Sequence, residues 1–408
     1  MAKLDIDFIR AQFPAFSEPS LQGQAFFENA GGSYTSKFVI DRLSRFYRTR
    51  KVQPYYPFEA SHLGGEEMDE ARMRLAGILN IGVDELSFGP STTQNTYVLS
   101  QAFRETLKTG DAIIVTNQDH EANSGPWRRL ADSGTEVREW KVDPETGFLD
   151  PTDLANLLDD KVKLVCFPHC SNIVGQINPV AEICAIIHGA GAVACVDGVS
   201  YAPHGLPDIG ALGADIYLFS SYKTFGPHQG IMFIARDLSA KLPYQGHYFN
   251  AGYAEKRFTP AGPDHAQVAA SAGMADYVDE VYAHHFDDWA TEAEKGRAVV
   301  GLQSAHETEL LKPLLEYLRG RNDIRLIGSD RAEERVPTVS IVLSHAAEKV
   351  TRDLAALGIM AGGGDFYAVR LLEALNVDPA HGVLRVSFVH YTNMQEVEQL
   401  LKALDQVL

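Results

Sequence analysis

The sequence predicts an α/β fold with a large, mostly parallel sheet and a smaller α+β domain at the carboxyl end. Between residues 86 and 233, short apolar runs rich in β-branched and aromatic side chains alternate with helical sequence. This is the pattern of a parallel sheet covered by helices on both faces. Strands and helices alternate again from residue 325 onward. With 408 residues, 45% of them hydrophobic, the chain can bury one large core and a smaller one.

Local patterns define the elements outside the large sheet. Three precede it: an amphipathic helix at 5–13, a strand opening into a glycine turn at 26–32, and an amphipathic helix at 65–80. A bridging region, 266–285, leads to a helical stretch from about 289 to 317, which Pro313 is expected to interrupt. We therefore expect three parts: an N-terminal segment, 1–30, that packs with the small domain, a large cofactor-binding domain, 31–285, and a small C-terminal domain, 286–408.

Lys223 follows directly after a predicted buried strand. The run at 214–219 is rich in β-branched and aromatic residues, and Ser220-Ser221-Tyr222 separates it from the lysine. A lysine carried at the end of a buried strand is desolvated, which lowers its pKa and makes its amine a usable nucleophile. A lone lysine at such a position is more often a solvated loop residue, so the interpretation depends on a partner.

Asp197 supplies that partner. It ends another short apolar strand, one helical crossover before Lys223, and the two side chains can converge at the carboxyl edge of a parallel sheet. A lysine that forms a Schiff base and a carboxylate that protonates a pyridine nitrogen are the pair that pyridoxal phosphate (PLP) requires. Asp197 alone could equally cap a helix, but the pair favours a PLP site.

Three further segments offer contacts that PLP needs. Thr92 and Thr93 stand at a strand-to-helix junction, where free N–H groups and hydroxyls suit a phosphate. His120 follows a strand and can stack on the pyridine ring and exchange protons at the substrate Cα. Asn172 also follows a strand and can donate to the cofactor's phenolic oxygen or to a substrate carboxylate. Taken singly, Thr92 and Thr93 fit a helix cap better and His120 fits a loop or core histidine better, whereas Asn172 fits a turn residue equally well.

The order of these motifs resembles the class V aminotransferase family of fold-type-I PLP enzymes, and most closely its cysteine desulfurase-like members. The matching motifs are the hydroxyl-rich turn at 91–96, His-x-Ala-Asn at 120–123, Ser-Asn-x-x-Gly-x-x-Asn-Pro at 171–179, Val-Asp-Gly at 196–198, Ser-x-x-Lys at 220–223, and Arg-Val-Ser-Phe at 385–388. Together they span about residues 26 to 405. The resemblance implies a large domain around a seven-stranded sheet and a PLP-dependent activity.

The resemblance also implies a role for each matching residue. Lys223 would form the Schiff base, Asp197 would contact the pyridinium nitrogen, and His120 would stack on the ring. The remaining cofactor contacts would come from Thr92, Thr93, Asn172, Ser200, Ser220, Tyr222 and Gly262. The substrate would be held by Arg385, Asn172 and Gly31. The arginine suits this role because a guanidinium holds a carboxylate through two parallel hydrogen bonds.

Three of these positions differ from the family pattern. Ser200 stands where relatives usually have a glutamine that reaches the phenolic oxygen, and Tyr222 stands where they usually have a histidine. Gly262 lies in the place of a Gly-Thr-Pro turn that reaches the neighbouring subunit's phosphate in relatives. The resemblance thus implies a homodimer with its sites at the subunit interface, and Gly262 would contribute its backbone N–H there.

The reaction is not determined by the resemblance, because the family includes desulfurases, transaminases, lyases and an epimerase. We expect a small amino acid to form an external aldimine and then to lose a carbon–sulfur or other β-bond. Transfer of the amino group to a keto acid is one alternative, and a non-catalytic binding protein is another. Cysteine desulfurases carry a persulfide on a cysteine shortly before the last strands, but the matching stretch, 358–369, has none. Its glycines, 362–364, allow a flexible loop close to a ligand, where Asp365 would supply an acid or base and Tyr367 a hydrogen bond. Alternatively, this stretch is only a tight turn into a helix at 367–375.

Composition is typical of a soluble metabolic enzyme. The net charge of −18 has no long run of one sign, which disfavours nucleic acids and membrane surfaces as partners. The amino terminus lacks a signal-peptide pattern, and no stretch approaches the ~18 apolar residues of a membrane span, so we expect a cytoplasmic protein. The four cysteines fall within residues 166–195; they are expected to be reduced and buried, without a metal site.

Overall fold

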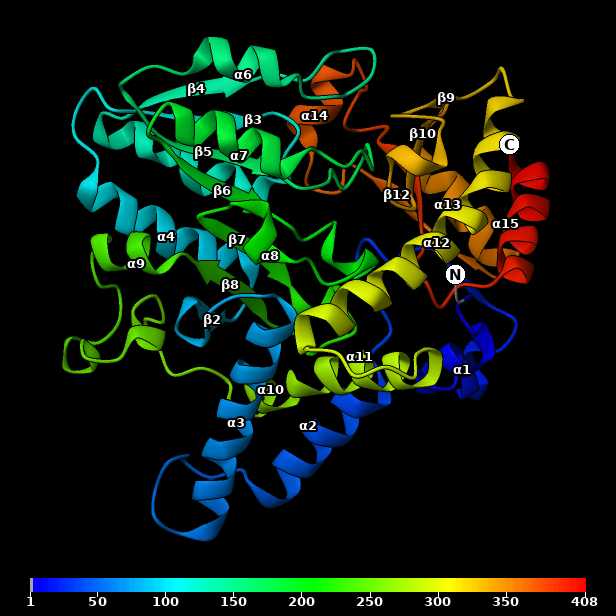
Figure 1. The fold of residues 1–408 in the computed structure, drawn as a ribbon. Helices are drawn as coiled ribbons and strands as arrows, with labels where there is room; N and C mark the ends of the chain where they lie inside the picture. Colours follow the sequence, from blue (N-terminus) through cyan, green and yellow to red (C-terminus); the bar gives the residue numbers. More distant parts are fainter. Residues whose placement is uncertain (1–2) are drawn as a thin grey trace.

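A seven-stranded sheet forms the centre of the larger part of the chain in the computed structural model, which describes residues 3–408 (Figure 1). The strands lie in the order β2-β8-β7-β6-β5-β3-β4. Their bounds are β2 (Leu86–Gly89), β3 (Ala112–Thr116), β4 (Glu136–Trp140), β5 (Val162–Pro168), β6 (Val193–Asp197), β7 (Ile216–Ser220) and β8 (Gly230–Ile234). Of these, β8 runs antiparallel to its neighbours and the other six share one direction. The mostly parallel sheet predicted from the sequence is confirmed.

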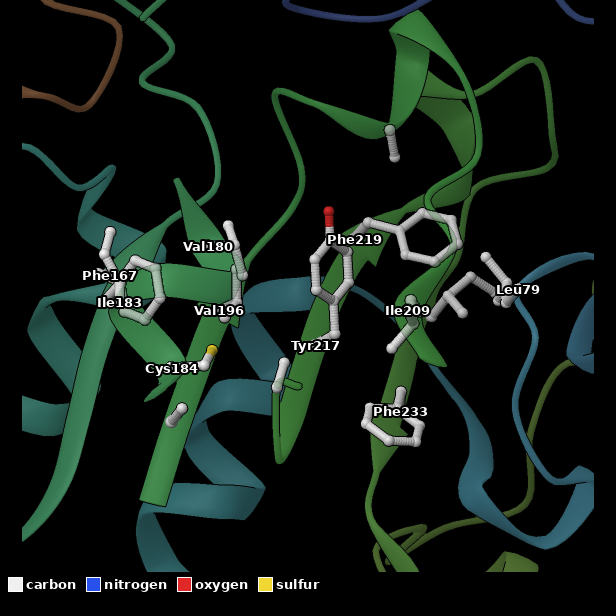
Figure 2. Close-up of a cluster of buried hydrophobic side chains, with 14 of the residues drawn as sticks. Leu79, Phe167, Val180, Ile183, Cys184, Val196, Ile209, Tyr217, Phe219 and Phe233 are labelled. Atoms are coloured by element: carbon white, nitrogen blue, oxygen red, sulfur yellow. The ribbon is translucent and has the colours of Figure 1, made fainter. Parts of the chain in front are cut away.

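Helices cover both faces of this sheet because successive side chains of a strand point to opposite faces. On one face, Val196 and Tyr217 pack in the same cluster as the apolar side of α7 (Val180–Gly189), as Figure 2 shows. On the other face, Leu218 packs in the cluster that contains the apolar side of α4 (Thr92–Thr106). The central strands are therefore buried from both sides, and polar groups are left to the loops at their ends.

The carboxyl ends of β5, β6 and β7 lie side by side. Pro168 pairs with Asp197, and Asp197 pairs with Leu218 of the next strand. Because parallel strands end at the same edge, the loops that follow them meet there. The start of α4 reaches this edge too: Gly230, the first residue of β8, lies so close to it that an added Cβ would come within 2.6 Å of the backbone nitrogen of Thr92.

A second, antiparallel sheet forms the core of the C-terminal part of the chain (Figure 1). Its order is β12 (Gly362–Gly364), β13 (Val383–Ser387), β10 (Thr338–Val342) and β9 (Arg325–Leu326). The apolar sides of three helices share one cluster with this sheet: α12 (Glu292–Arg319), α13 (Ala347–Ala356) and α15 (Met394–Val407). The smaller α+β unit predicted at the carboxyl end is thus present.

An N-terminal strand packs with this C-terminal unit. β1 (Ala25–Phe26) pairs in parallel with β11 (Ile359–Met360). Phe27 lies in the same apolar cluster as the second sheet, and its carbonyl oxygen accepts a hydrogen bond from the backbone N–H of Ser387 at 2.7 Å. The segment from 25 to 27 therefore extends the packing of strands that are more than 300 positions later in the chain.

The remaining helices surround these two sheets. They are α1 (Ile6–Arg10), α2 (Lys37–Thr49), α3 (Glu59–Ile78), α5 (Gly125–Arg128), α6 (Pro151–Leu157), α8 (Ile209–Leu212), α9 (Arg236–Lys241), α10 (His265–Ala270), α11 (Ala272–His285) and α14 (Val369–Ala374). The expected bridging region is helical, and its helices α10 and α11 pack against α2 and α3 (Figure 1). No helix in residues 3–408 has both the length and the apolar character needed to cross a bilayer.

Pro313 does not interrupt the helix in which it lies, so that prediction from the sequence was wrong. α12 is 28 residues long and continues through Pro313 without a break. It begins with a capping box between Thr291 and Glu294. A proline inside a helix removes one backbone hydrogen bond. Leu311 and Leu314, on either side of Pro313, are buried against the second sheet. Burial of this apolar face holds the helix together despite the missing bond.

One substitution tests the close contact between α11 and α2. An added Cβ at Gly273 would come within 2.5 Å of the backbone nitrogen of Val39. We expect Gly273→Ala to lower the free energy of unfolding by about 1–3 kcal/mol, because the methyl group must push two helices apart. Gly301→Ala, in an open part of α12, is the control and should be neutral or stabilising by about 1 kcal/mol. Equal stability of the two variants, measured by urea denaturation, would contradict this packing.

Candidate functional site

A pocket lies at the carboxyl edge of the large sheet, between the start of α4 and the loops after β3, β5, β6 and β7. It is lined by Ser91, Thr92, Thr93, His120, Ala122, Pro168, Cys170, Ser171, Asn172, Asp197, Val199, Ser200, Ser220, Tyr222, Lys223 and His228. The structure thus brings together all the predicted catalytic and cofactor-binding residues except Gly262.

Lys223 closes a short 3₁₀ turn, η7 (Ser221–Lys223), directly after β7. Its side chain is buried, and this burial lowers the pKa of the amine to about 8. The Arg385 guanidinium lowers the pKa as well, whereas the carboxylates of Asp197 and Glu28 act in the opposite direction. A useful fraction of the amine is therefore uncharged near neutral pH, as a nucleophilic lysine requires.

Asp197 is the last residue of β6 and is buried. Its Oδ1 accepts a hydrogen bond from the backbone N–H of Val199 at 2.8 Å. Burial raises the pKa of the carboxyl group to about 6, and the Val199 hydrogen bond and the Lys223 charge limit the rise. The group is thus mostly ionised at neutral pH, in a water-poor place where it can stabilise a protonated ring nitrogen.

The start of α4 provides an anion site. Ser91 is the N-cap, and its hydroxyl accepts a hydrogen bond from the backbone N–H of Gln94 at 3.2 Å. The N–H groups of Thr92 and Thr93, in the first turn, do not use this cap and point out of the helix end. The hydroxyls of Thr92 and Ser220 lie 2.9 Å apart at the same place. Donors of this kind at a helix N-terminus suit a phosphate group.

His120 is held as a neutral imidazole with a defined tautomer. Its Nδ1 accepts a hydrogen bond from the backbone N–H of Ala122 at 3.0 Å, so the ring proton must lie on Nε2. Burial, the largest cause, and the charges of Lys223 and Arg385 together lower the pKa of the ring to about 3. An uncharged ring can stack on an aromatic cofactor, and its Nε2–H can donate a hydrogen bond.

Asp119 positions the loop that carries His120, and sequence reasoning missed it. Its two carboxyl oxygens accept hydrogen bonds from the Thr116 hydroxyl at 2.6 Å and from the Asn123 amide at 3.0 Å. The amide oxygen of Asn123 in turn accepts from the Trp127 indole. Burial raises the pKa of Asp119 to about 8. Its place in a strand-to-turn junction is the only local signal of this role, and that signal is weak.

Arg385 and Asn172 lie together, although they come from different sheets. Arg385, in β13, is 3% exposed, and its Nη1 donates to the backbone oxygen of Asn172 at 3.3 Å. The face of the guanidinium lies 3.7 Å from the centre of the Phe366 ring. The Asn172 side-chain amide donates to the backbone oxygen of Phe366 at 3.0 Å. Gly31 lies nearby, against the side chain of Glu28, which pairs with Arg385.

The glycine run at 362–364 is not the flexible loop expected from the sequence. It forms β12, with Gly362 opposite Arg385 of β13. An added Cβ at Gly363 would come within 2.8 Å of the backbone of Ala347, so the glycines allow α13 to pack closely. Asp365 accepts a hydrogen bond from the backbone N–H of Tyr367 at 2.8 Å and so closes a turn. Pairing with β13 explains why this stretch is ordered.

The three positions that differ from the family pattern have different outcomes. Ser200 and Tyr222 both line the pocket. The Tyr222 ring stacks on His228 with 4.7 Å between ring centres. His228 also lines the pocket, but it was not predicted from the sequence. A loop histidine after a Gly-Pro turn carries no specific signal. Gly262 is outside this pocket, and no atom of residues 3–408 lies within 4 Å of the Cβ it would carry. Its contact with a neighbouring subunit stays a prediction.

These residues fit PLP. Lys223 offers an amine with a lowered pKa, Asp197 offers a carboxylate, and α4 offers an anion site, all around one pocket. In addition, Oδ1 of Asn172 is buried without a hydrogen-bond partner in the described chain, residues 3–408. Because Asn172 also lines the pocket, this oxygen is available to accept a hydrogen bond from a bound group.

Comparisons with known proteins agree with this geometry. The family model "Aminotransferase class-V" matches residues 25–400. The aminotransferase-like protein FGM3 of Gibberella zeae is 33% identical, and the alignment covers 100% of this chain and 99% of that protein. A cysteine desulfurase of Serratia proteamaculans is 29% identical, with 98% of each chain covered. The solved structure of a cysteine desulfurase from Thermococcus onnurineus shares the fold, with a TM-score of 0.85 at 23% identity, covering 100% of this chain and 99% of that one.

The lowered pKa of Lys223 predicts a pH-dependent cost to stability in cofactor-free protein. The pKa falls from 10.5 to about 8 on folding, so the unfolded chain binds more protons between these values and stability rises with pH across them. We expect Lys223→Met to be more stable than the unchanged protein at pH 7 by about 3 kcal/mol. The difference should shrink as the pH rises through this window.

Urea denaturation at pH 7 and at pH 9 measures the stability difference between Lys223→Met and the unchanged protein and its change with pH. Lys141→Met replaces an exposed lysine and serves as the control. Its stability relative to the unchanged protein should be the same at both pH values. If Lys223→Met is no more stable than the unchanged protein at pH 7, then the amine is not buried as the structure shows.

Proposed function

The chain belongs to the class-V aminotransferase family of PLP-dependent enzymes, and on that premise we propose that it acts on a small amino acid by elimination at the β-carbon. The observation that carries this proposal is the convergence of Lys223, Asp197 and His120 with the start of α4 in one pocket. Family membership also favours an enzyme over the non-catalytic binding protein considered as an alternative.

Three groups would hold the cofactor. Lys223 Nζ would bond to it covalently, the Asp197 carboxylate would pair with its ring nitrogen, and the first turn of α4 with Ser220 would bind its phosphate. Tyr222 and Ser200, which line the same pocket, would replace the histidine and glutamine of relatives. Bound PLP would supply an electron sink for the bond that breaks at the substrate.

The chain's own groups would orient the substrate and move its protons. Arg385 would bind the carboxylate of the amino acid, with Asn172 beside it, because a guanidinium holds a carboxylate through two parallel hydrogen bonds. Lys223 Nζ, with a pKa of about 8, would take the proton from Cα once it is free. His120 is a neutral imidazole with its hydrogen on Nε2 and would therefore donate a hydrogen bond, not a proton, toward the leaving group or the ring.

The state of the thiols favours elimination over persulfide transfer. Cysteine is absent from the chain after Cys195. Cys170 lines the pocket, but it is 2% exposed. Burial raises its pKa above the usual range, and its Sγ lies 3.5 Å from the Ser171 carbonyl oxygen. A thiol that stays protonated is a poor nucleophile, so sulfur would leave as free sulfide or thiol.

Transamination is the second candidate. It is favoured by the relative with the higher identity of the two reported, which is named an aminotransferase-like protein. The pocket residues serve both reactions equally, since each begins with the loss of a proton from Cα. Only the products distinguish them.

We also propose that the protein is a homodimer. Aromatic side chains that are more than half exposed gather in two segments, 55–58 and 248–253. Burial is the main cause of the raised pKa of Tyr55, and the charge of Glu255, which follows the second segment, adds to it. Exposed apolar surface of this kind is typical of a protein–protein interface. Gly262, which would meet the partner's cofactor, follows the second segment in the chain.

Product analysis tests the reaction. The PLP-loaded protein is incubated with cysteine and a panel of small amino acids. Elimination predicts ammonia and a keto acid in equal amounts, with free sulfide from cysteine, and mass spectrometry should find no persulfide on Cys170. Asp197→Ala should keep the cofactor attached to Lys223, as borohydride trapping would show, and lose turnover by about a hundredfold or more.

Three outcomes would contradict the proposal. Conversion of the cofactor to its pyridoxamine form without ammonia would favour transamination. A stoichiometric persulfide on Cys170 would show sulfur transfer to the protein. A protein that binds no PLP, with no absorption band lost in Lys223→Ala, would exclude this cofactor altogether.

Sedimentation velocity tests the dimer. We expect the unchanged protein to sediment as a dimer and Phe249→Glu, which places a charge in the exposed segment, to shift it toward monomer. Trp289→Ser is the control: Trp289 is 87% exposed but lies in the loop between α11 and α12, outside the two segments. A monomeric unchanged protein, or an equal shift in both variants, would speak against the proposed interface.

A further inference from the structure

The arginine that would bind the substrate carboxylate already holds a carboxylate of the chain itself. Oε1 of Glu28 lies 2.5 Å from Nη2 of Arg385. Arg385 is 3% exposed, whereas the Glu28 side chain is 30% exposed. The ion pair thus joins a fixed, buried cation to an anion that has a route to solvent.

The backbone of Glu28 is fixed, so only its side chain is free to move. Glu28 forms a parallel bridge with Ser387, two residues after Arg385. The backbone N–H of Ala30 donates to the Ser387 hydroxyl at 2.8 Å, and the N–H of Gly31 donates to the Glu28 carbonyl at 3.0 Å. The turn therefore places the Glu28 carboxylate beside Arg385 by construction.

Two glycines leave space for this carboxylate. A Cβ at Gly31 would overlap Oε2 of Glu28. A Cβ at Gly362 would come within 2.9 Å of the Phe366 ring and within 3.2 Å of Oε1 of Glu28. Neither Gly31 nor Gly362 has a backbone conformation that requires glycine. The carboxylate thus explains the lack of a side chain at Gly31, and the Phe366 ring together with the carboxylate explains it at Gly362.

Glu28 competes with a second carboxylate for the same nitrogen of Arg385. A guanidinium offers two edges for a pair of parallel bonds, Nε with Nη2 and Nη1 with Nη2, and Nη2 directs one N–H to each edge. Glu28 holds one of these two N–H groups. Nε is buried and has no partner within residues 3–408, and Phe366 covers one face of the group at 3.7 Å. A substrate carboxylate that forms two bonds must also use Nη2, so it would lie beside the Glu28 carboxylate and be repelled by it unless Glu28 moves away.

The negative charge of Glu28 also acts on groups that line the pocket. Its carboxylate contributes to the raised pKa of Tyr222 and opposes the lowering of the Lys223 pKa. The charge of Glu28 therefore acts on the Lys223 end of the pocket, where the amino group of a substrate would react. An incoming anion meets a negative charge there, and an incoming ammonium group meets a favourable one.

We propose that Glu28 is a specificity-determining residue that competes with carboxylates for Arg385, so that the site accepts amino acids and rejects carboxylates without an amino group. An amino acid gains additional binding free energy at the Lys223 end of the pocket and can displace Glu28 into solvent. A keto acid or a simple carboxylate lacks that gain. The inference rests on the proposed role of Arg385 as the substrate clamp, and it favours release of a keto acid once it is formed.

Two substitutions remove the competitor by different routes. Glu28→Gln keeps the shape of the side chain but removes its charge, and Gly31→Ala places a methyl group where the carboxylate lies. The probe is propionate, a carboxylate without an amine, titrated against cofactor-free protein by ligand-observed NMR. We expect both variants to bind propionate about tenfold more tightly, or more, than the unchanged protein, because a charge-assisted bond is freed.

Two controls locate the effect. Gly32→Ala adds a methyl group one residue further on, where it meets only the Tyr222 ring at 3.7 Å, and should leave propionate affinity within about twofold of the unchanged protein. Arg385→Gln in the Glu28→Gln background should abolish the gain. Thermal melts of all variants establish that each is folded.

The outcomes separate this inference from the proposed reaction. Unchanged or weaker propionate binding in both Glu28→Gln and Gly31→Ala would overturn it and show that Glu28 only braces Arg385. A gain that survives Arg385→Gln would also overturn it, together with the clamp. A gain that requires Arg385 supports the inference even if no amino acid is found to undergo elimination.

Discussion

The pocket depends on the register between β5, β6 and β7. Pro168, Asp197 and Leu218 are paired across these strands, so the three loops that follow begin at the same level. The register is fixed by the two apolar cores, because a slip of one residue would turn the inward side chains of each strand to the opposite face. Buried residues such as Val196 and Tyr217 therefore determine where the Asp197 carboxylate and the Lys223 amine meet.

Burial of charge is the second constraint on this site. Lys223 and Arg385 are buried cations, and Asp197 and Glu28 are the carboxylates beside them. Each ion would be costly to bury alone, and each lowers the cost of its neighbour. His120 stays neutral in this company because burial and the two cations all disfavour its charged form. The chemical state of the imidazole is thus a consequence of its neighbours.

The sequence predicted the large sheet and most of the pocket because both depend on local patterns. Apolar runs that end in Asp197, Lys223 or His120 mark strand ends, and the ends of parallel strands must meet. The course of α12 through Pro313 could not be predicted locally, since burial on the second sheet outweighs the missing hydrogen bond. The pairing of Glu28 with Arg385 was missed for a similar reason. It joins residues from opposite ends of the chain, and no short motif encodes such a contact.

The pairing of β1 with β11 has a consequence for the order in which the protein is assembled. A chain leaves the ribosome with its N-terminal residues first. Asp197 ends β6 and Lys223 follows β7, and the strands that pair with β6 and β7 are translated soon before or after them. The strand at 25–26 must wait for 359–360, and the bridge from Glu28 must wait for Ser387. The half of the pocket that would hold the cofactor can therefore form during translation, while the half around Arg385 closes only when synthesis is nearly complete.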